Sequence, residues 1–354
     1  MNSDFWSGKR VFLTGHTGFK GGWLSLWLQS MGAEVHGYSL SPPTETNFFG
    51  VAEVGKGMKS SAIADIRDAD KLRTAMQAAQ PEIVFHLAAQ PLVRYSYVQP
   101  AETYAVNVMG TVHLLEAVRA TPGVKVVVNV TTDKCYENRE WIWGYRENEA
   151  MGGFDPYSSS KGCAELVTSA YRRSFLESAG IALASARAGN VIGGGDWAAD
   201  RLIPDFLRAM DAGKTLEIRS PQSTRPWQHV LEPLSGYLSL GEKLYVEGAS
   251  FAEGWNFGPA DDDAQSVRWI VEQLTEMRKD IKWKFNETPQ PHEANYLKLD
   301  SSKAHVQLDW HPQWRLRTAL QKTLDWHEAW RNAENMKVVT MRQIADYQST
   351  KQNA

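Results

Sequence analysis

The sequence predicts an α/β protein with a doubly wound parallel sheet and a smaller, discontinuous second lobe. Two observations predict this fold class. Through the first half of the chain, short β-branched segments alternate with amphipathic segments of helical length, which is typical of a parallel sheet covered by helices. Beyond Gly189 the alternation gives way to loops rich in Gly, Pro and Trp, which indicates a second structural unit.

The predicted elements follow one another in a regular order. Strands are predicted at residues 10–15, 33–39, 82–89, 124–132 and 181–189, and helices at residues 21–32, 68–80, 101–120 and 157–175. A helix at 232–248 and a strand at 254–258 are expected to return to the sheet. We therefore expect a first domain over residues 1–190 joined by 229–258, a second lobe from 191–228 and 259–335, and a peripheral C-terminal tail over 336–354.

Composition limits the possible functions of the 354-residue chain. Its hydrophobic fraction of 43% and charged fraction of 22% are those of an ordinary globular protein. A net charge of −3 gives no basic field for nucleic acid, and no apolar run approaches the length of a membrane span. The polar N-terminus and the two cysteines, which have neither disulfide nor metal-ligand spacing, indicate a cytoplasmic protein without a bound metal.

A glycine-rich turn follows the first predicted strand. In LTGHTGFKGGWL, Gly15, Gly18 and Gly21 stand at the start of a helix, with Thr17 and Phe19 between them. Glycines at these positions let backbone N–H groups approach a pyrophosphate at the positive end of the helix. The alternative interpretation is a tight strand–helix turn without a ligand. The place of the loop in the first βαβ unit favours a Rossmann-type dinucleotide site.

The spacing of charged residues does not decide between NAD and NADP. The acidic residue expected roughly 20 positions after the loop is missing. Glu34 has that spacing, but it begins the second strand, which ends in Tyr38-Ser39-Leu40. No arginine stands at that strand end to bind a 2′-phosphate, so the sequence favours NAD. The other residues expected around the cofactor are Asp65 and Ile66 at the adenine, and Leu87, Ala88, Ala89 and Thr131.

A tyrosine and a lysine lie one helical turn apart. In PYSSSK, Tyr157 and Lys161 have i, i+4 spacing just after a proline at a helix start, so both side chains share one face. A cation beside a phenol favours the phenolate, which can take a proton from an alcohol. This pair alone is common on protein surfaces. The glycine loop, and the polar end of the strand that finishes in Thr131-Thr132, strengthen the catalytic interpretation.

These motifs together resemble a known family. The segments GHTGFKGGWLSLWL, TTDKCYEN, RAGNVIGGGDWAADRLIPD, RPWQHVLEPLSGYL and HEANYLKLDSSKA are similar to those of extended short-chain dehydrogenases/reductases that act on nucleotide sugars, and within them to the CDP-glucose 4,6-dehydratase family. The resemblance extends from Lys9 to about Trp330.

The resemblance implies a lyase with a transient redox cycle that uses NAD. Tyr157 would deprotonate the glucose 4-hydroxyl, Lys161 would hold the nicotinamide ribose, and Thr132 would bond the 4-oxygen. Water would then be lost across C5–C6, and the product would be CDP-4-keto-6-deoxyglucose, a precursor of dideoxy sugars in bacterial surface polysaccharide. Asp133 is expected to protonate the leaving 6-hydroxyl. Other dehydratases carry glutamate at the position of Lys134, so either this lysine or another group removes the C5 proton.

Polar residues of the second half are expected to hold the substrate. Guanidinium groups bind diphosphate bidentately, so Arg225 first, then Arg219 and Arg201, are candidates for the clamp. Solvated surface arginines are the alternative. Asn190 is expected to bond a phosphate or the sugar, and Trp197 and Tyr296 to wall the base or hexose unless they belong to the core.

Two rival functions and an assembly follow from the same residues. A nucleotide-sugar 4-epimerase shares the glycine loop and the Tyr–Lys pair but has no use for Asp133-Lys134, and a dehydratase of a different nucleotide sugar is a third possibility. A non-catalytic NAD-sensing regulator would not need the Tyr–Lys pair. Apolar residues on more than one side of helices 97–120 and 157–177 predict a homodimer or a dimer of dimers.

Overall fold

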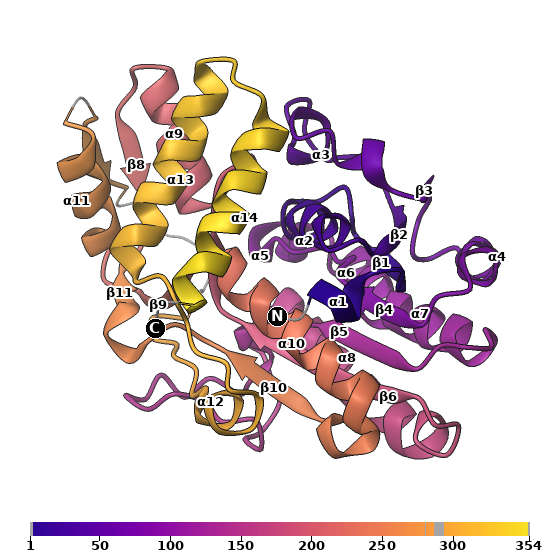
Figure 1. Ribbon diagram of the computed structural model, residues 1–354. Coiled ribbons are helices and arrows are strands. Elements are labelled where there is room, and N and C mark those ends of the chain that lie inside the picture. The colour runs from indigo at the N-terminus through magenta and orange to yellow at the C-terminus, as the bar shows by residue number, and fades with distance from the viewer. Residues whose placement is uncertain (1–2, 280, 287–293, 353–354) are drawn as a thin grey trace.

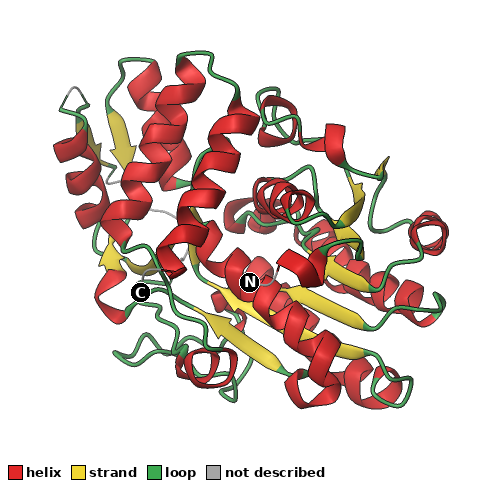
Figure 2. Cartoon of the chain, in the orientation of Figure 1, coloured by secondary structure: helices red, strands yellow, loops and turns green. Residues whose placement is uncertain are grey.

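A seven-stranded parallel sheet forms the centre of the protein (Figures 1 and 2). The computed structural model describes residues 3–279, 281–286 and 294–352. The strand order is β10-β6-β5-β4-β1-β2-β3, and every pairing in this sheet is parallel. The predicted fold class is thereby confirmed. The strands are β1 Arg10–Thr14, β2 Glu34–Ser39, β3 Ser60–Ile63, β4 Ile83–His86, β5 Val126–Val130, β6 Ala182–Ala188 and β10 Gly254–Phe257.

Helices cover both faces of this sheet. On one face, α2 (Phe19–Ser30) and α10 (Leu231–Glu247) pack against Val11 and Leu13 of β1. On the other face, α4 (Ala69–Ala79) and α7 (Gly110–Arg119) pack against Phe12 of the same strand, and α8 (Pro156–Tyr171) follows them in the chain. Successive residues of a strand point to opposite faces, so both faces are apolar and both are buried.

The second lobe has its own core and two small sheets, ordered β11-β9-β7 and β12-β8. The chain enters it after β6, returns to the main sheet through α10 and β10, and then enters it again, as the colours of Figure 1 show. The lobe contains β7 Asn190–Ile192, α9 Leu202–Asp211, β8 Leu216–Ile218, β9 Thr224–His229, β11 Ala264–Ser266, α11 Val267–Met277, β12 Trp283–Phe285 and α13 Leu316–Arg331, while α12 Ser302–Leu308 contacts β10.

The remaining elements are short. They are α1 Ser3–Trp6, α3 Phe48–Val51, α5 Val93–Val98 and α6 Pro100–Tyr104, together with the turns η1 Val54–Gly57, η2 Ala105–Met109, η3 Asp133–Cys135, η4 Arg172–Leu176, η5 Gly248–Phe251 and η6 Asp261–Asp263. Within the described ranges, every helix falls short of the length or apolarity needed to cross a bilayer. Residues 1–2, 280, 287–293 and 353–354 belong to segments predicted above and lie outside the described part, so His292 and Glu293 of HEANYLKLDSSKA are not placed.

Two elements differ from the sequence prediction. The helix predicted at 101–120 is divided by the wider π-turn η2, which aims Asn107 at Gln90 and Ser160; its amide donates to the Ser160 hydroxyl at 2.9 Å. The edge strand β3 had no boundaries in the sequence, because its Ser60 and Ser61 are exposed and give no apolar alternation.

The C-terminal segment, expected as a peripheral helix, is the helix α14 (Met336–Gln352). Val339, Ile344 and Tyr347 belong to the core cluster that also contains α2. The Tyr347 hydroxyl donates to the buried carboxyl of Glu232 on α10 at 2.5 Å. Burial raises the pKa of Glu232 to about 7, and hydrogen bonds from Tyr347 and from two backbone N–H groups oppose that shift. The polar composition of the segment concealed its single apolar face.

We expect the Tyr347→Phe substitution to destabilise the protein by about 1–3 kcal/mol, because a buried oxygen of Glu232 loses one of its two donors while the ring stays in place. Urea unfolding at pH 7 measures this. Val338→Ala is the matched control, since Val338 is exposed on the same helix and its truncation should change stability by less than about 0.5 kcal/mol. Equal losses in the two variants would contradict the assigned role of the hydroxyl.

Candidate active site

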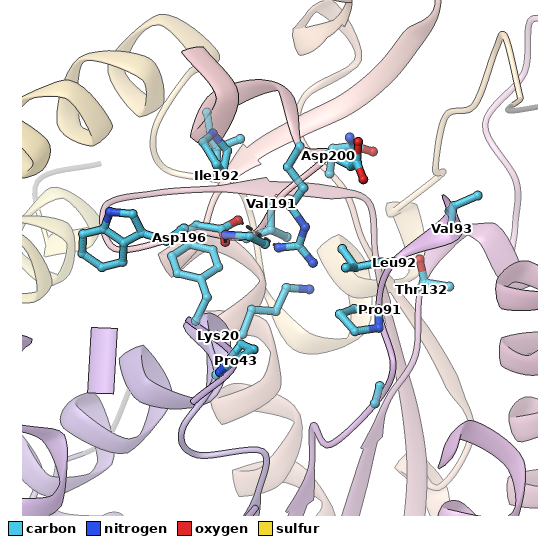
Figure 3. A pocket seen from close by; sticks show the side chains of 18 of the residues that line it. Lys20, Pro43, Pro91, Leu92, Val93, Thr132, Val191, Ile192, Asp196 and Asp200 are labelled. Carbon is cyan, nitrogen blue, oxygen red and sulfur yellow. Dashed lines mark hydrogen bonds and ion pairs between the residues drawn. The ribbon is translucent and has the colours of Figure 1, made fainter. Parts of the chain in front are cut away.

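A cavity of about 590 Å³ lies at the carboxyl ends of β1, β4, β5 and β6, where they face the second lobe. Figure 3 shows side chains from both units pointing into it. Parallel α/β sheets bind ligands at this edge. The predicted site residues that line the cavity are Gly15, Thr17, Gly18, Phe19, Gly21, Asp65, Ile66, Leu87, Ala88, Ala89, Thr131, Thr132, Asp133, Lys134, Tyr157, Lys161, Asn190, Trp197, Arg201, Arg219 and Arg225.

The glycine loop is packed too closely for side chains. A Cβ atom on Gly21 would lie 2.1 Å from the carbonyl oxygen of Gly15, and one on Gly15 would lie 2.8 Å from the backbone of Ala88. Gly15 also has a φ of +77°, which disfavours a side chain. Gly18 caps α2 without a side-chain hydrogen bond. The helix N-terminus therefore opens directly onto the cavity, as a pyrophosphate site requires.

The end of the cavity where the sequence predicts the adenine has side chains that bond other protein groups. The Thr17 hydroxyl donates to the Leu40 carbonyl at 2.8 Å and also contacts Ser39, so it fastens the loop to the end of β2. Arg67 hydrogen-bonds both oxygens of Asp65 and lowers the pKa of that carboxyl. The predicted bond from Asp65 to adenine would have to share this carboxylate with Arg67.

The end of β5 carries a buried carboxyl with one unused oxygen. Asp133 is 1% exposed, and its Oδ1 accepts from the Thr132 hydroxyl at 2.9 Å. Its Oδ2 has no hydrogen-bond partner among the described residues. Burial raises the pKa of Asp133, and the neighbouring Lys134, Thr132 and Arg225 only oppose that shift. A neutral carboxyl in this position can donate its proton into the cavity.

The first two turns of α8 hold Tyr157 and Lys161, the pair that the sequence predicts to be catalytic. Asp155 caps the helix by accepting from the backbone of Ser158, and Pro156 begins it, so Tyr157 and Lys161 follow on one face. Tyr157 is 8% exposed and Lys161 is 6% exposed. Burial raises the pKa of Tyr157 to about 12, against a hydrogen bond to Thr132. Burial lowers the pKa of Lys161 to about 8, and Glu165 opposes this.

Two further residues at this strand end have distinct surroundings. Lys134 lines the cavity from η3, where its backbone N–H faces the Thr132 hydroxyl at 3.4 Å. The hydroxyl of Thr131 donates to Glu165 at 2.5 Å. Because its hydroxyl bonds Glu165, Thr131 could contact a cofactor only through its backbone and methyl group. The sequence prediction named the residue without naming these atoms.

Arginines line the side of the cavity formed by the second lobe. Arg201 pairs with Asp196 at 2.9 Å, and Arg219 pairs with Asp200 at 3.2 Å. Arg225 is 4% exposed and donates to the backbone carbonyl of Thr224. Three guanidinium groups thus line this side of the cavity, and a diphosphate could exchange with the aspartate partners of two of them.

Two aromatic predictions differ in outcome. Trp197 lines the cavity, but its ring also packs at 5.8 Å from Trp326 and 5.3 Å from Trp330, so much of it is core. Tyr296 is not among the lining residues; its backbone bridges to Thr224 and accepts a hydrogen bond from Asn138. A substrate contact by the Tyr296 ring has no support in this geometry.

The sequence analysis missed Lys20. This side chain extends from the glycine loop into the middle of the cavity (Figure 3). Burial and the nearby Arg201 lower its pKa to about 8, while Asp133 and Asp196 oppose the shift. Its position inside the glycine motif, where phosphate-binding loops of this type expose backbone atoms, was the signal that could have identified it.

Comparison with known proteins shows the family of the chain. The family described as GDP-mannose 4,6 dehydratase matches residues 12–323. A CDP-glucose 4,6-dehydratase of Salmonella typhimurium is 58% identical over 355 residues, covering 99% of both chains. A UDP-glucose 4-epimerase of Mycolicibacterium smegmatis is 26% identical, covering 74% of this chain and 80% of its own.

Solved structures share the fold. A dTDP-glucose 4,6-dehydratase from Streptomyces venezuelae, with NAD and TYD bound, has a TM-score of 0.78 at 23% identity and covers 92% of this chain and 98% of its own. A UDP-glucose-4-epimerase from Stenotrophomonas maltophila with bound NAD has a TM-score of 0.77 at 19% identity, with 92% and 99% coverage. Both enzyme classes therefore occur on this fold, and side chains must distinguish them.

Proposed function

The chain belongs to the GDP-mannose 4,6-dehydratase family, and from this premise we infer that it is an NAD-dependent 4,6-dehydratase that converts CDP-glucose to CDP-4-keto-6-deoxyglucose. The substrate follows from the relative that is 58% identical over 99% of the chain. The observation that carries the reaction type is the convergence of Asp133, Lys134 and Tyr157 on one cavity. The sequence resemblance is confirmed.

The cavity fits the cofactor. The space that a Cβ atom would fill at Gly15 and Gly21 is already occupied by backbone, so the loop keeps the N-terminus of α2 open for a pyrophosphate. We expect Gly18, Phe19 and the small Ala88 to lie along the dinucleotide. When bound, NAD would supply a hydride acceptor for C4, a hydride donor for C6, and in its oxidised ring a positive charge that favours the phenolate of Tyr157.

Oxidation at C4 uses the α8 pair. Tyr157 takes the proton of the 4-hydroxyl, and Thr132, which hydrogen-bonds the phenol, also reaches the 4-oxygen. Lys161 stands one turn further along and supplies the positive charge that holds the ribose and the phenolate. Because Tyr157, Thr132 and Lys161 are buried, water is kept away from the ketone that forms at C4.

Elimination uses the end of β5. The 4-ketone acidifies the C5 proton, so a base on that side can remove it. Burial raises the pKa of Asp133 and so favours its neutral form, from which it would give its proton to the departing 6-oxygen. Lys134 is either the base that removes the C5 proton or a charge that stabilises the enolate. We favour the base, because a protonated Asp133 would not hold Lys134 in its charged form as a carboxylate would.

The diphosphate of the substrate is expected at the arginines of the second lobe. Arg201, Arg219 and Arg225 line that side of the cavity, and Asn190 stands at the start of β7 between them and the sheet. Bidentate guanidinium contacts suit diphosphate. The structure offers no rule for the cytosine base, so this part of the substrate rests on the close relative.

A 4-epimerase is the second candidate, because a curated epimerase is similar over 74% of this chain. Asp133 disfavours it, since an epimerase has no leaving group for a neutral carboxyl to protonate. Purified protein incubated with CDP-, dTDP-, UDP- and GDP-sugars distinguishes the candidates. We expect CDP-glucose to give a keto sugar that absorbs in alkali. A product with the galactose configuration would identify an epimerase. No turnover of any of these sugars would favour a regulator.

We also propose a cytoplasmic location and a homo-oligomer. Cys135 and Cys163 are free thiols, which suits a reducing compartment. Large apolar side chains are exposed on the paired helices at one side of the first domain, including Tyr104, Met109 and Leu166. A second copy could cover them in a four-helix bundle.

We expect Tyr157→Phe to lose about 10²–10⁴-fold in turnover while it still binds NAD, because the phenol acts on the substrate. Steady-state kinetics and cofactor titration measure both quantities. Tyr171→Phe is the control, since that hydroxyl, on the same helix, bonds Glu116 outside the cavity. Near-normal turnover of Tyr157→Phe would overturn the assignment.

We expect Lys134→Met to oxidise C4, seen as reduced-cofactor absorbance, but to exchange the C5 proton slowly in deuterated water, because the base is missing. Mass spectrometry of recovered sugar measures the exchange. Rapid C5 exchange in this variant would show that Lys134 is an electrostatic partner and that another group is the base.

We expect the protein to sediment as a dimer or tetramer at micromolar concentration and Leu166→Arg to shift it toward monomer, because a buried charge opposes association. Leu166 is 61% exposed in the single chain. Val246→Arg on α10 is the control, since Val246 is 72% exposed on a different helix. A monomeric unaltered chain would contradict the proposal.

A further inference from the structure

A buried carboxylate lies directly below the catalytic pair. Glu165 is on α8, one turn after Lys161 and two turns after Tyr157, so the three side chains share one stripe of the helix. Glu165 is 4% exposed and does not line the cavity, so it cannot touch substrate or cofactor. Any effect on the reaction must pass through its neighbours.

The carboxylate accepts four hydrogen bonds. Arg187 on β6 donates to both oxygens, at 2.9 Å and 2.8 Å. Ser185 donates to one oxygen at 2.6 Å, and Thr131 donates to the other at 2.5 Å. Burial alone would raise the pKa of Glu165, but Arg187 and these hydroxyls hold it below its ordinary value, so the group is an anion.

The bond from Thr131 links this anion to the end of β5. Thr131 directly precedes Thr132 and Asp133, which act on the substrate. Its backbone N–H is fixed by the Ala186 carbonyl at 2.9 Å, and its hydroxyl by Glu165. Two hydrogen bonds thus hold Thr131 at the strand end and fix the direction in which the chain continues to Thr132 and Asp133.

The same anion lies one helical turn from Lys161 and favours its charged form. Besides the proposed base Tyr157, the titratable groups of the described residues that interact with Lys161 include Glu165 on its own helix, Cys135 on η3, His86 on β4 and Lys20 on α2. Burial keeps the Cys135 thiol and the His86 ring neutral, because it raises the pKa of the first and lowers that of the second to about 3. Lys20 is a cation that repels Lys161. Glu165 is therefore the one anion of this group.

We propose that Glu165 is a positioning residue, whose carboxylate, oriented by Arg187, keeps Lys161 charged and fixes the end of β5 for the oxidation at C4. This deepens the proposed function and rests on it for the identity of the reaction. Arg187 also donates to the Tyr136 hydroxyl at 2.7 Å, which in turn donates to Asn256 of β10. The anion is thus anchored to two strands of the sheet as well as to the catalytic helix.

The first test follows the charge of Lys161 without turnover. In protein labelled with ¹³C at lysine Cε, the Lys161 signal is assigned by its loss in Lys161→Met and titrated with pH. Glu165→Gln keeps the shape of the side chain and removes the charge, so we expect the titration midpoint to fall by about one pH unit or more. Ser185→Ala removes one hydrogen bond and leaves the charge, so its midpoint should stay near that of the unaltered chain.

The second test follows the reaction. In Glu165→Gln, we expect the basic limb of the plot of kcat/KM against pH to move to lower pH by as much as the Lys161 titration midpoint moves. At a pH above that limb, kcat/KM should then fall by about tenfold for each pH unit of the shift. Glu165→Asp should return the limb toward its original position. If Glu165→Gln folds poorly, the double variant Glu165→Gln/Arg187→Met replaces it. Removing both charges of a buried pair is often tolerated. The same fall in the Lys161 titration midpoint is expected.

An unchanged Lys161 midpoint in Glu165→Gln, or a loss of rate that is equal at every pH and follows the melting temperature, would overturn the positioning role. Failure of the proposed function is separate, because it appears as no turnover of CDP-glucose by the unaltered chain. The lysine titration needs neither substrate nor cofactor and decides the charge effect in either case.

Discussion

The close packing of the Gly15–Gly21 loop onto the ends of β1 and β4 is the constraint on which the active site depends. A Cβ atom on Gly21 would lie only 2.1 Å from the carbonyl oxygen of Gly15, so the compact shape of the loop requires glycine there. That shape sets the start of α2 at Phe19, exposes the helix N-terminus, and brings Lys20 into the cavity. The same packing brings the end of β4 against the loop, so the walls of the cofactor site are fixed by backbone rather than by side chains.

A second constraint fixes the loop that carries Asp196 and Arg201. Gly194 lies against Trp326 of α13, where a Cβ would be 2.1 Å from the ring, and Gly195, with a φ of +84°, lies against Phe48. The two rings stack at 5.9 Å, and the Trp23 indole of α2 donates to the Gly194 carbonyl at 3.0 Å. The substrate side of the cavity is therefore anchored to the helix that forms the cofactor side, although the two are far apart in the chain.

The sequence predicted the sheet well because its strands are short apolar runs between recognisable helices, and it predicted many residues that line the cavity because their motifs are local. It failed where a side chain depends on distant partners. The polar sequence of α14 does not show that Tyr347 hydrogen-bonds Glu232. The sequence around Trp197 does not show that its ring packs on Trp326. Lys20 was missed for the same reason, since only the fold shows that it faces Asp133 and Arg201.

Burial drives the protonation states of the catalytic pair away from the order that catalysis needs, a phenolate beside an ammonium. It is the largest cause that raises the pKa of Tyr157 to about 12 and lowers that of Lys161 to about 8. Fixed charges oppose both shifts: Arg201 favours deprotonation of the phenol, and Glu165 favours the ammonium of Lys161. The oxidised cofactor ring would add a further positive charge beside the phenol. The stripe of α8 thus alternates a base, a cation and an anion, and the anion is kept charged in turn by Arg187. The buried Glu165–Arg187 pair adds little net stability, because desolvation offsets most of its attraction. The negative charge that Glu165 presents to Lys161 is therefore the stronger physical reason for its place beneath the site.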